Sequence, residues 1–374
     1  MANYIKSLDG LRGIAVLLVI IYHFSKLPFI GFDFELGWIG VQLFFVLSGF
    51  LITKILIQEK KETLNFYLKR FYWRRTLRIF PIYFLYLLLI YVIWLLSHEP
   101  NDFKFSIPYL LTYTYNFSVL AESWEITRLY SHLWSLSIEE QFYLLWPIIV
   151  YVLSIRGLKI LAITIIILTP FVRLILGEIL INTMATEELA GIGVYWFTLS
   201  HFDAFAVGGV LNIIHENTRH KIIRFGWIVW LMVLTAGILN LVNYDAELTS
   251  YEWTSLGYLL PVLENYQHVW SYTLLNLLFG IMILSASLKK TTPFLEVKPL
   301  VFMGKISYGM YLYHFIIIVF VEKLFTDRNI NGLLLLFITL GVITLVSYLS
   351  YIIFEKKFLV LKNKKFNKMP SNIT

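Results

Sequence analysis

The sequence of 374 residues contains no cysteine, and charged residues make up only 15% of it. The absence of cysteine excludes disulfides, thiolate nucleophiles and zinc–thiolate sites. The scarcity of charge, with a hydrophobic content of 58% and a mean hydropathy of +0.72, excludes an ordinary soluble domain and a disordered chain alike. Sequence repeats, low-complexity tracts and soluble domains longer than a loop are also missing from the sequence.

Long apolar runs predict an all-α, polytopic integral membrane protein. Two short apolar segments, 107–120 and 253–263, are predicted to be re-entrant or interfacial. No small-residue cleavage site follows the first long run, so we expect it to remain as a transmembrane helix. About ten runs have the length and hydropathy of a transmembrane helix, with approximate limits 11–31, 37–57, 79–97, 136–154, 160–178, 193–214, 226–243, 269–288, 300–321 and 332–354.

The distribution of basic residues predicts the orientation of the chain. With the N-terminus in the cytoplasm, the cytoplasmic segments collect 23 of the 31 Lys and Arg residues, whereas the outer segments hold five. This bias favours a topology with both termini inside. The formal charge of +7 is therefore a topology signal and an attraction to anionic lipid, and nucleic acid is not an expected partner. We divide the chain into a membrane domain, 1–356, and a basic cytoplasmic tail, 357–374.

Two ionisable residues interrupt the first predicted span. An ionisable side chain inside a spanning helix costs a few kcal/mol on insertion scales, so Arg12 and His23 are functional-site candidates by default. Eleven residues of helix rise about 16 Å, which is roughly half of the hydrocarbon core. We therefore expect Arg12 at one membrane face and His23 near the midplane. This spacing indicates chemistry inside a bilayer.

Five clusters of polar residues interrupt the apolar background, and together they resemble the bacterial membrane acyltransferase-3 family of integral-membrane O-acyltransferases. The resemblance runs from Leu8 to about Lys356 and rests on the presence of all five clusters in the same order. The clusters read SLDGLRG (7–13) leading to YHF (22–24), GVQLFFVLSGFLI (40–52), RRTLRIFPIY (74–83), HLWSLSIEEQFY (132–143) and ISYGMYLYH (306–314).

The resemblance implies about ten helices, an acyl-CoA donor from the cytoplasm and an acceptor that usually lies outside it. The sequence departs from the family pattern at two positions. Gln42 stands where many relatives carry an acidic residue. His201 stands, two residues before Asp203, where many relatives carry the arginine of an Arg-x-Asp motif. These departures concern acceptor specificity more than the class of reaction.

His23 is the candidate general base. Transfer of an acyl group to a sugar hydroxyl requires removal of the hydroxyl proton, and a buried neutral imidazole suits this step at neutral pH. The alternative is a histidine that only packs against its helix neighbours. Arg12 cannot be a base because it stays protonated. It could hold a phosphate, orient a carboxylate such as Asp9, or anchor the helix as a cytoplasmic positive charge. The resemblance implies that the spacing between Arg12 and His23 is functional.

Arg74, Arg75 and Arg78 form a dense basic cluster on neighbouring faces of a predicted helix. Coenzyme A carries phosphates, and the guanidinium fork binds phosphate in bidentate fashion. The resemblance implies that the Arg75-x-x-Arg78 motif is functional. We therefore predict that Arg12, Arg75 and Arg78 bind acyl-CoA as a donor substrate, with a role in topology alone as the alternative. No permanently bound cofactor and no metal is expected.

Glu139 is predicted to be a second catalytic residue near the outer face, where its carboxylate could orient His23 or bind acceptor hydroxyls. The alternative, which also applies to Glu140, is a charge that is favourable at a helix N-terminus behind a serine cap. Ser48 is interpreted as a small residue that permits close helix packing and not as a nucleophile, because the sequence contains no Gly-x-Ser-x-Gly motif.

The sequence therefore predicts an O-acyltransferase of the inner membrane. The main hypothesis is O-acetyl transfer from acetyl-CoA to a hydroxyl of an extracytoplasmic glycan or lipid-linked sugar, either directly or through an acyl-histidine intermediate. The rival class is a transporter that moves an acyl group or a small solute without catalysing its transfer, because intramembrane charges suit it equally well. His132 is a candidate acceptor contact, and His314 and Asp203 are intramembrane polar residues without an assigned role.

Overall fold

The computed structural model describes residues 4–27, 30–97, 102–121, 124, 127–243, 253–260, 263–288, 292–326, 328 and 330–364, and this part of the chain contains only helices and connecting segments. Within it, eight helices are long and apolar enough to cross a membrane, and they overlap eight of the ten predicted spans. These helices are α1 Lys6–Ser25, α2 Ile39–Glu59, α3 Leu64–Ser97, α6 Ile155–Ile181, α9 Glu216–Asn243, α11 Gln267–Ser287, α12 Lys298–Phe325 and α13 Gly332–Ser350.

Shorter helices connect the long ones. The predicted span 136–154 is α5, and the predicted short segment 107–120 forms the end of α4 and a 3-10 helix, η2. Part of the predicted basic tail forms α14, whereas residues 365–374 and the basic residues Lys289 and Lys290 lie outside the described residues. The shorter elements are η1 Glu35–Trp38, α4 Asp102–Leu111, η2 Tyr115–Leu120, α5 Leu133–Val152, α7 Glu187–Trp196, η3 Thr198–His201, α8 Phe202–Val210, η4 Glu264–Tyr266, η5 Pro293–Glu296, the π-helical turn η6 Tyr351–Glu355 and α14 Lys356–Lys364.

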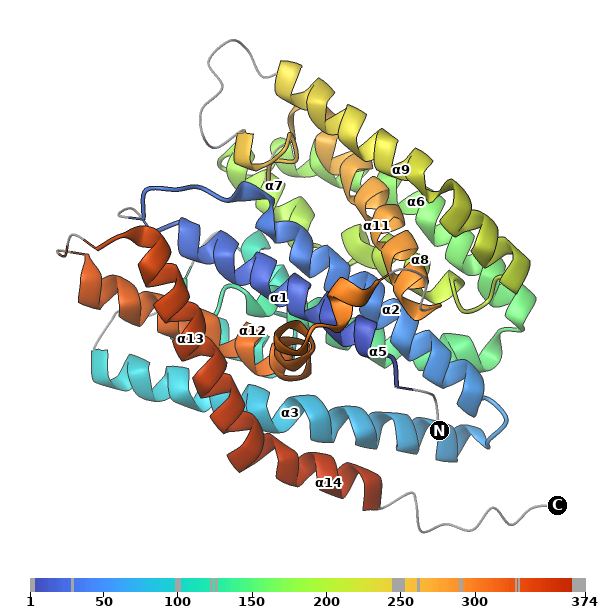
Figure 1. Cartoon of the computed structure of the whole chain (residues 1–374), viewed down its shortest axis with the longest axis horizontal. Helices are drawn as coiled ribbons and strands as arrows, with labels where there is room; N and C mark the ends of the chain where they lie inside the picture. The colour runs from blue at the N-terminus through green and yellow to red at the C-terminus, as the bar shows by residue number, and fades with distance from the viewer. Residues whose placement is uncertain are drawn as a thin grey trace.

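The long helices divide into a central and a peripheral set. In Figure 1, α1 and α2 cross the middle of the molecule, α3 lies in the lower part above α14, and α6, α9 and α11 lie together at the upper right. Of the most apolar window of α12, 72% is buried inside the protein, compared with 17% of that of α9. Between Phe225 and Val242, most of the exposed side chains of α9 are large and apolar. A helix that remains apolar where it is exposed is suited to contact with lipid.

The central helices α1 and α12 run parallel and touch through their backbones. A Cβ atom added to Gly304 would lie 1.8 Å from the carbonyl oxygen of Asp9, and one added to Gly13 would lie 2.3 Å from that of Leu300. Small residues at such positions let two helices approach closely. This contact fixes how α1 lies along α12.

The first helix differs from its predicted limits of 11–31. It begins earlier because Arg12 and Asp9 form an ion pair inside it, with Nη1 and Oδ1 2.8 Å apart, so that both charges are accommodated in one helix. It ends at Ser25, ahead of Pro28 in the sequence, and proline disfavours helical backbone at the residue before it. His23 therefore lies in the last turn of α1 and not in the middle of a span with the predicted limits 11–31.

The predicted span 193–214 is not one continuous helix, because the chain leaves the helical conformation at Phe197 (φ −73°, ψ 131°) between α7 and η3. Asn116, which lies in η2, stabilises the backbone on both sides of this break. Its Nδ2 donates hydrogen bonds to the carbonyl oxygen of Trp196 (3.1 Å) and to Oγ1 of Thr198 (2.9 Å). A broken helix persists in an apolar setting only where the freed backbone groups find partners, and an apolar window does not reveal such partners.

Candidate active site

The five polar clusters of the sequence converge on one cavity of about 360 Å³ between α1, α2, α3, α5 and α12. A cavity of this size is at the lower end of the range of small-molecule sites. Three of the arginines and the glutamate predicted as site residues line the same space, although they come from three different helices. The residues that carry the argument below are Arg12 from α1, Ser48 from α2, Arg75 and Arg78 from α3, Glu139 from α5 and Tyr311 from α12.

Arg12 is held in place by its own helix. Its guanidinium pairs with one oxygen of Asp9, which was one of its expected roles, and the Tyr4 hydroxyl donates a hydrogen bond to the other oxygen at 2.7 Å. Burial and this hydrogen bond to Asp9 raise the pKa of Tyr4 to about 12, so the phenol stays a donor. Arg12 therefore faces the cavity as a partly neutralised charge.

Arg75 and Arg78 differ from the other arginines of the cavity. Arg74 forms an ion pair with Glu59, with Nη1 and Oε1 3.0 Å apart. In the part of the chain that the structure describes, neither Arg75 nor Arg78 forms an ion pair, although both line the cavity. The side chain of Arg75 is half-buried and that of Arg78 is exposed, and guanidinium forks at accessible positions bind phosphate and carboxylate groups. Two such guanidinium groups in one cavity are therefore suited to an anionic ligand.

Glu139 lies in the same cavity and not beside His23. Its Oε1 accepts hydrogen bonds from the hydroxyl groups of Ser48 and Tyr143. The guanidinium carbon of Arg75 lies 3.9 Å from the centre of the Tyr143 ring, which connects the carboxylate to the arginine end of the cavity. The structure therefore brings Glu139 together with Arg75, and the idea that its carboxylate orients His23 is wrong.

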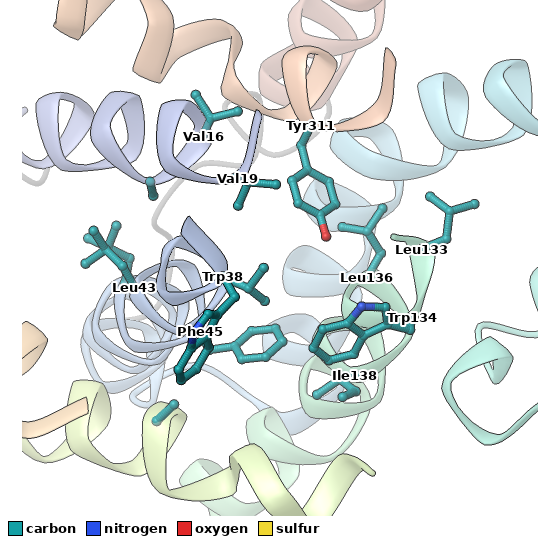
Figure 2. Close-up of a cluster of buried hydrophobic side chains, with 14 of the residues drawn as sticks. Val16, Val19, Trp38, Leu43, Phe45, Leu133, Trp134, Leu136, Ile138 and Tyr311 are labelled. Atoms are coloured by element: carbon teal, nitrogen blue, oxygen red, sulfur yellow. The ribbon is translucent and has the colours of Figure 1, made fainter. Parts of the chain in front are cut away.

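Tyr311 lines the cavity and also contacts the rings of His132 and His314, which do not line it. Its hydroxyl donates a hydrogen bond to the carbonyl oxygen of His132 (2.9 Å) and shares a second hydrogen bond with Oγ of Ser135 (2.5 Å). Figure 2 shows the phenol extending from α12 toward Leu136 and Trp134, near the start of α5. Tyr311, His132 and Ser135 are all buried, so Tyr311 separates the cavity from the histidines behind it.

Three histidines lie beyond Tyr311. Nδ1 of His23 and Nε2 of His314 are 3.0 Å apart, and their rings stack with centroids 5.0 Å apart. The ring of His132 meets the ring of His314 edge-on, with centroids 4.9 Å apart. His314 and His132 are buried, whereas His23 keeps part of its side chain exposed. His23 is not among the residues that line the cavity, so the structure separates the proposed base from the arginines.

A second polar centre lies between α2, α6 and α8. Arg173 and Asp203 form a fully buried ion pair, with Nη1 and Oδ2 3.1 Å apart. Next to it, Nε2 of Gln42 and Nδ1 of His201 are 3.0 Å apart, and Nε2 of His201 contacts the carbonyl oxygen of Tyr195 at 2.5 Å. The two positions at which the sequence departs from the family pattern are therefore hydrogen-bonded to each other.

Several residues of the site were missed from the sequence. Ser48 was assigned to packing, and Tyr143 and Tyr311 were not considered. A signal was present, because Ser135, Glu139 and Tyr143 follow each other at intervals of four residues, which places them on one face of a helix. Tyr311 and His314, which are three residues apart, likewise lie on one face of α12. No comparable signal connected His314 to His23, because the two residues lie on helices far apart in the sequence.

The fold and the cavity define a polytopic helical membrane protein with an arginine-lined site. The sequence model of the acyltransferase domain matches residues 5–352. The chain therefore belongs to the acyltransferase-3 family, a family of multi-pass membrane proteins. The similarity covers all five polar clusters.

Relatives in Staphylococcus aureus carry the names of O-acetyltransferases. The chain is 30% identical over 400 residues to "Putative O-acetyltransferase SACOL0978" of strain COL, an alignment that covers 99% of this chain and 60% of the relative. It is 28% identical over 338 residues to O-acetyltransferase OatA of strain NCTC 8325 / PS 47, covering 88% of this chain and 53% of OatA. The chain thus spans about 60% of the length of the first of these relatives and about half of the length of the second. No solved structure matches it significantly.

Proposed function

We propose that this protein is an O-acyltransferase of the inner membrane that moves an acetyl group from acetyl-CoA to a hydroxyl of an extracytoplasmic glycan or lipid-linked sugar. The observation that carries the proposal is that Arg75 and Arg78, which form no ion pair among the described residues, line a cavity that Tyr311 separates from a histidine pair. Family membership and the names of the relatives support the reaction class.

The arginine end is the proposed donor site. Arg75 and Arg78, with Arg12 beside them, offer planar forks to the phosphates of coenzyme A. The phosphates stay at the arginines while the acyl end of the molecule extends into the cavity toward Tyr311. Glu139 holds the hydroxyl groups of Ser48 and Tyr143 in place along this path. Movement of the Tyr311 ring would then open the way to His23.

The histidine end is the proposed acceptor site. His23 takes the proton of the acceptor hydroxyl, the oxygen attacks the thioester carbonyl, and the coenzyme A thiolate leaves and is protonated. His23 lies in the last turn of α1, next to Lys26, which pairs with Glu35 at that end of the molecule. The basic residues of the sequence favour the arginine end as the cytoplasmic side, so the acceptor approaches His23 from outside.

The experiment is mass spectrometry of cell-envelope glycans from cells that produce wild-type or variant protein. We predict that His23→Ala abolishes the mass increase of one acetyl group per modified sugar while the protein stays inserted at wild-type levels, because the reaction loses its base. His215→Ala, in an exposed position away from the cavity, is the control and should keep the modification. Glycans that remain acetylated in the His23→Ala cells would show that His23 is not the base.

A further inference from the structure

The hydrogen-bond partners of His314 determine which of its two ring nitrogens carries the hydrogen. Its Nδ1 lies 2.6 Å from the carbonyl oxygen of Tyr311. A carbonyl oxygen only accepts hydrogen bonds, so this nitrogen carries a hydrogen. In a neutral imidazole the other nitrogen then has a free lone pair. Nε2 of His314 is therefore a hydrogen-bond acceptor.

This assignment determines the tautomer of His23. Nε2 of His314 faces Nδ1 of His23 at 3.0 Å, so the hydrogen between the two rings belongs to His23. The Nε2 of His23 keeps its lone pair, on the one imidazole of the group that is partly exposed. Phe315 lies next to His314 on α12, and its ring packs against the imidazole of His23 with the two centroids 4.3 Å apart.

We propose that His314 is a positioning residue that holds His23 in the Nδ1–H tautomer, so that Nε2 of His23 is the atom that removes the acceptor proton; this rests on the acyltransferase function proposed above. The proton moves from the acceptor hydroxyl to Nε2, and the hydrogen on Nδ1 stays between the rings. The resulting imidazolium keeps its hydrogen bond to His314. A base oriented by a third group is a recurring arrangement in acyl transfer.

Two amide substitutions separate positioning from packing. Glutamine places its amide near the position of Nε2 of His314, so His314→Gln keeps an acceptor for His23. Asparagine places its amide near Nδ1, so His314→Asn keeps the contact to Tyr311 but offers no acceptor to His23.

The assay measures acetyl transfer from acetyl-CoA to envelope glycan in membrane vesicles. We expect kcat to fall about 100-fold in His314→Asn and less than about 10-fold in His314→Gln, because general base catalysis contributes at least that factor. KM for acetyl-CoA should stay within about threefold, since the donor site is untouched.

A second measurement does not depend on activity. Solid-state NMR of protein with ¹⁵N-labelled histidine should show the hydrogen of His23 on Nδ1 in wild type and in His314→Gln, and on Nε2 in a substantial share of His314→Asn. Equal loss of activity in the two amide variants, wild-type activity in His314→Asn, or an Nε2–H tautomer in wild type would each overturn the proposal. Activity that survives His23→Ala would instead overturn the proposed function, so the two failures are distinguishable.

Discussion

In the proposed reaction, Arg75 and Arg78 are the residues on which donor binding depends most directly. We predict that Arg75→Ala and Arg78→Ala each weaken acetyl-CoA binding by about 10- to 150-fold, since a lost charge-assisted hydrogen bond costs about 1.5–3 kcal/mol. Arg75→Lys should also lose affinity, because an ammonium group cannot reproduce the planar fork. Equilibrium binding of labelled acetyl-CoA to the purified protein measures the effect.

The matched control for these substitutions is Arg128→Ala. Arg128 is half exposed, pairs with Glu322 and lies outside the cavity. An exposed ion pair contributes little to stability, so this variant should bind acetyl-CoA as wild type does. If both alanine variants of the cavity bind the donor as tightly as Arg128→Ala, the basic cluster on α3 is a topology signal only.

Substitutions at Gln42 and His201 test whether these two positions pair directly. Both side chains are completely buried and hydrogen-bonded to each other. Gln42→Glu or His201→Arg alone buries an uncompensated charge, which we expect to lower the free energy of unfolding by about 3–5 kcal/mol. The double substitution restores the opposite charges typical of many family members. Thermal unfolding in detergent should show it to be at least about 1 kcal/mol more stable than the two single effects predict by addition. Simple additivity would contradict a direct pairing of the two positions.

At the level of elements, the contact between α1 and α12 sets the geometry of the histidine pair. A methyl group at Gly304 would collide with the backbone of α1, so Gly304→Ala should lower the free energy of unfolding by about 1–3 kcal/mol and reduce acetyl transfer. Gly341→Ala on α13 is the control, because a Cβ there meets nothing within 4 Å. It should change stability by about 0.5 kcal/mol or less. Equal effects of the two substitutions in thermal unfolding would show that the helix contact is not tight.

Hydropathy located the long helices because eight of them are continuous apolar runs. Hydropathy placed the start of α1 too late, because it does not show that the charges of Asp9 and Arg12 form an ion pair within the helix. It also missed the break at Phe197, because Asn116, which binds the freed backbone, lies elsewhere in the chain.

The candidate site was predictable to a similar extent. Arg12, Arg75, Arg78 and Glu139 were identified by residue type and motif, and the structure places all four in one cavity. The partner of His23 was not predictable, because His314 lies 291 residues further along the chain. A contact of this kind depends on how two helices pack, and no periodicity within either helix encodes it.

At the scale of the whole molecule, the proposed reaction uses two separate groups of polar residues. The arginines and the cavity lie on one side of Tyr311, and the histidines lie on the other. The spacing of Arg12 and His23 on α1 corresponds to a rise of about 16 Å along the helix. An acyl group can cross such a depth at lower cost than coenzyme A, whose phosphates are strongly hydrated. The account therefore predicts a reaction in which donor and acceptor never share a compartment.

The most direct measurement of this claim uses the purified protein oriented in sealed proteoliposomes. Labelled acetyl-CoA is supplied only on the face that carries the arginine end, and the envelope glycan acceptor is supplied only on the opposite face. The account predicts labelled acceptor, no leakage of acetyl-CoA across the membrane and no label with His23→Ala. Transfer of label only when both substrates are present on the arginine side would contradict it.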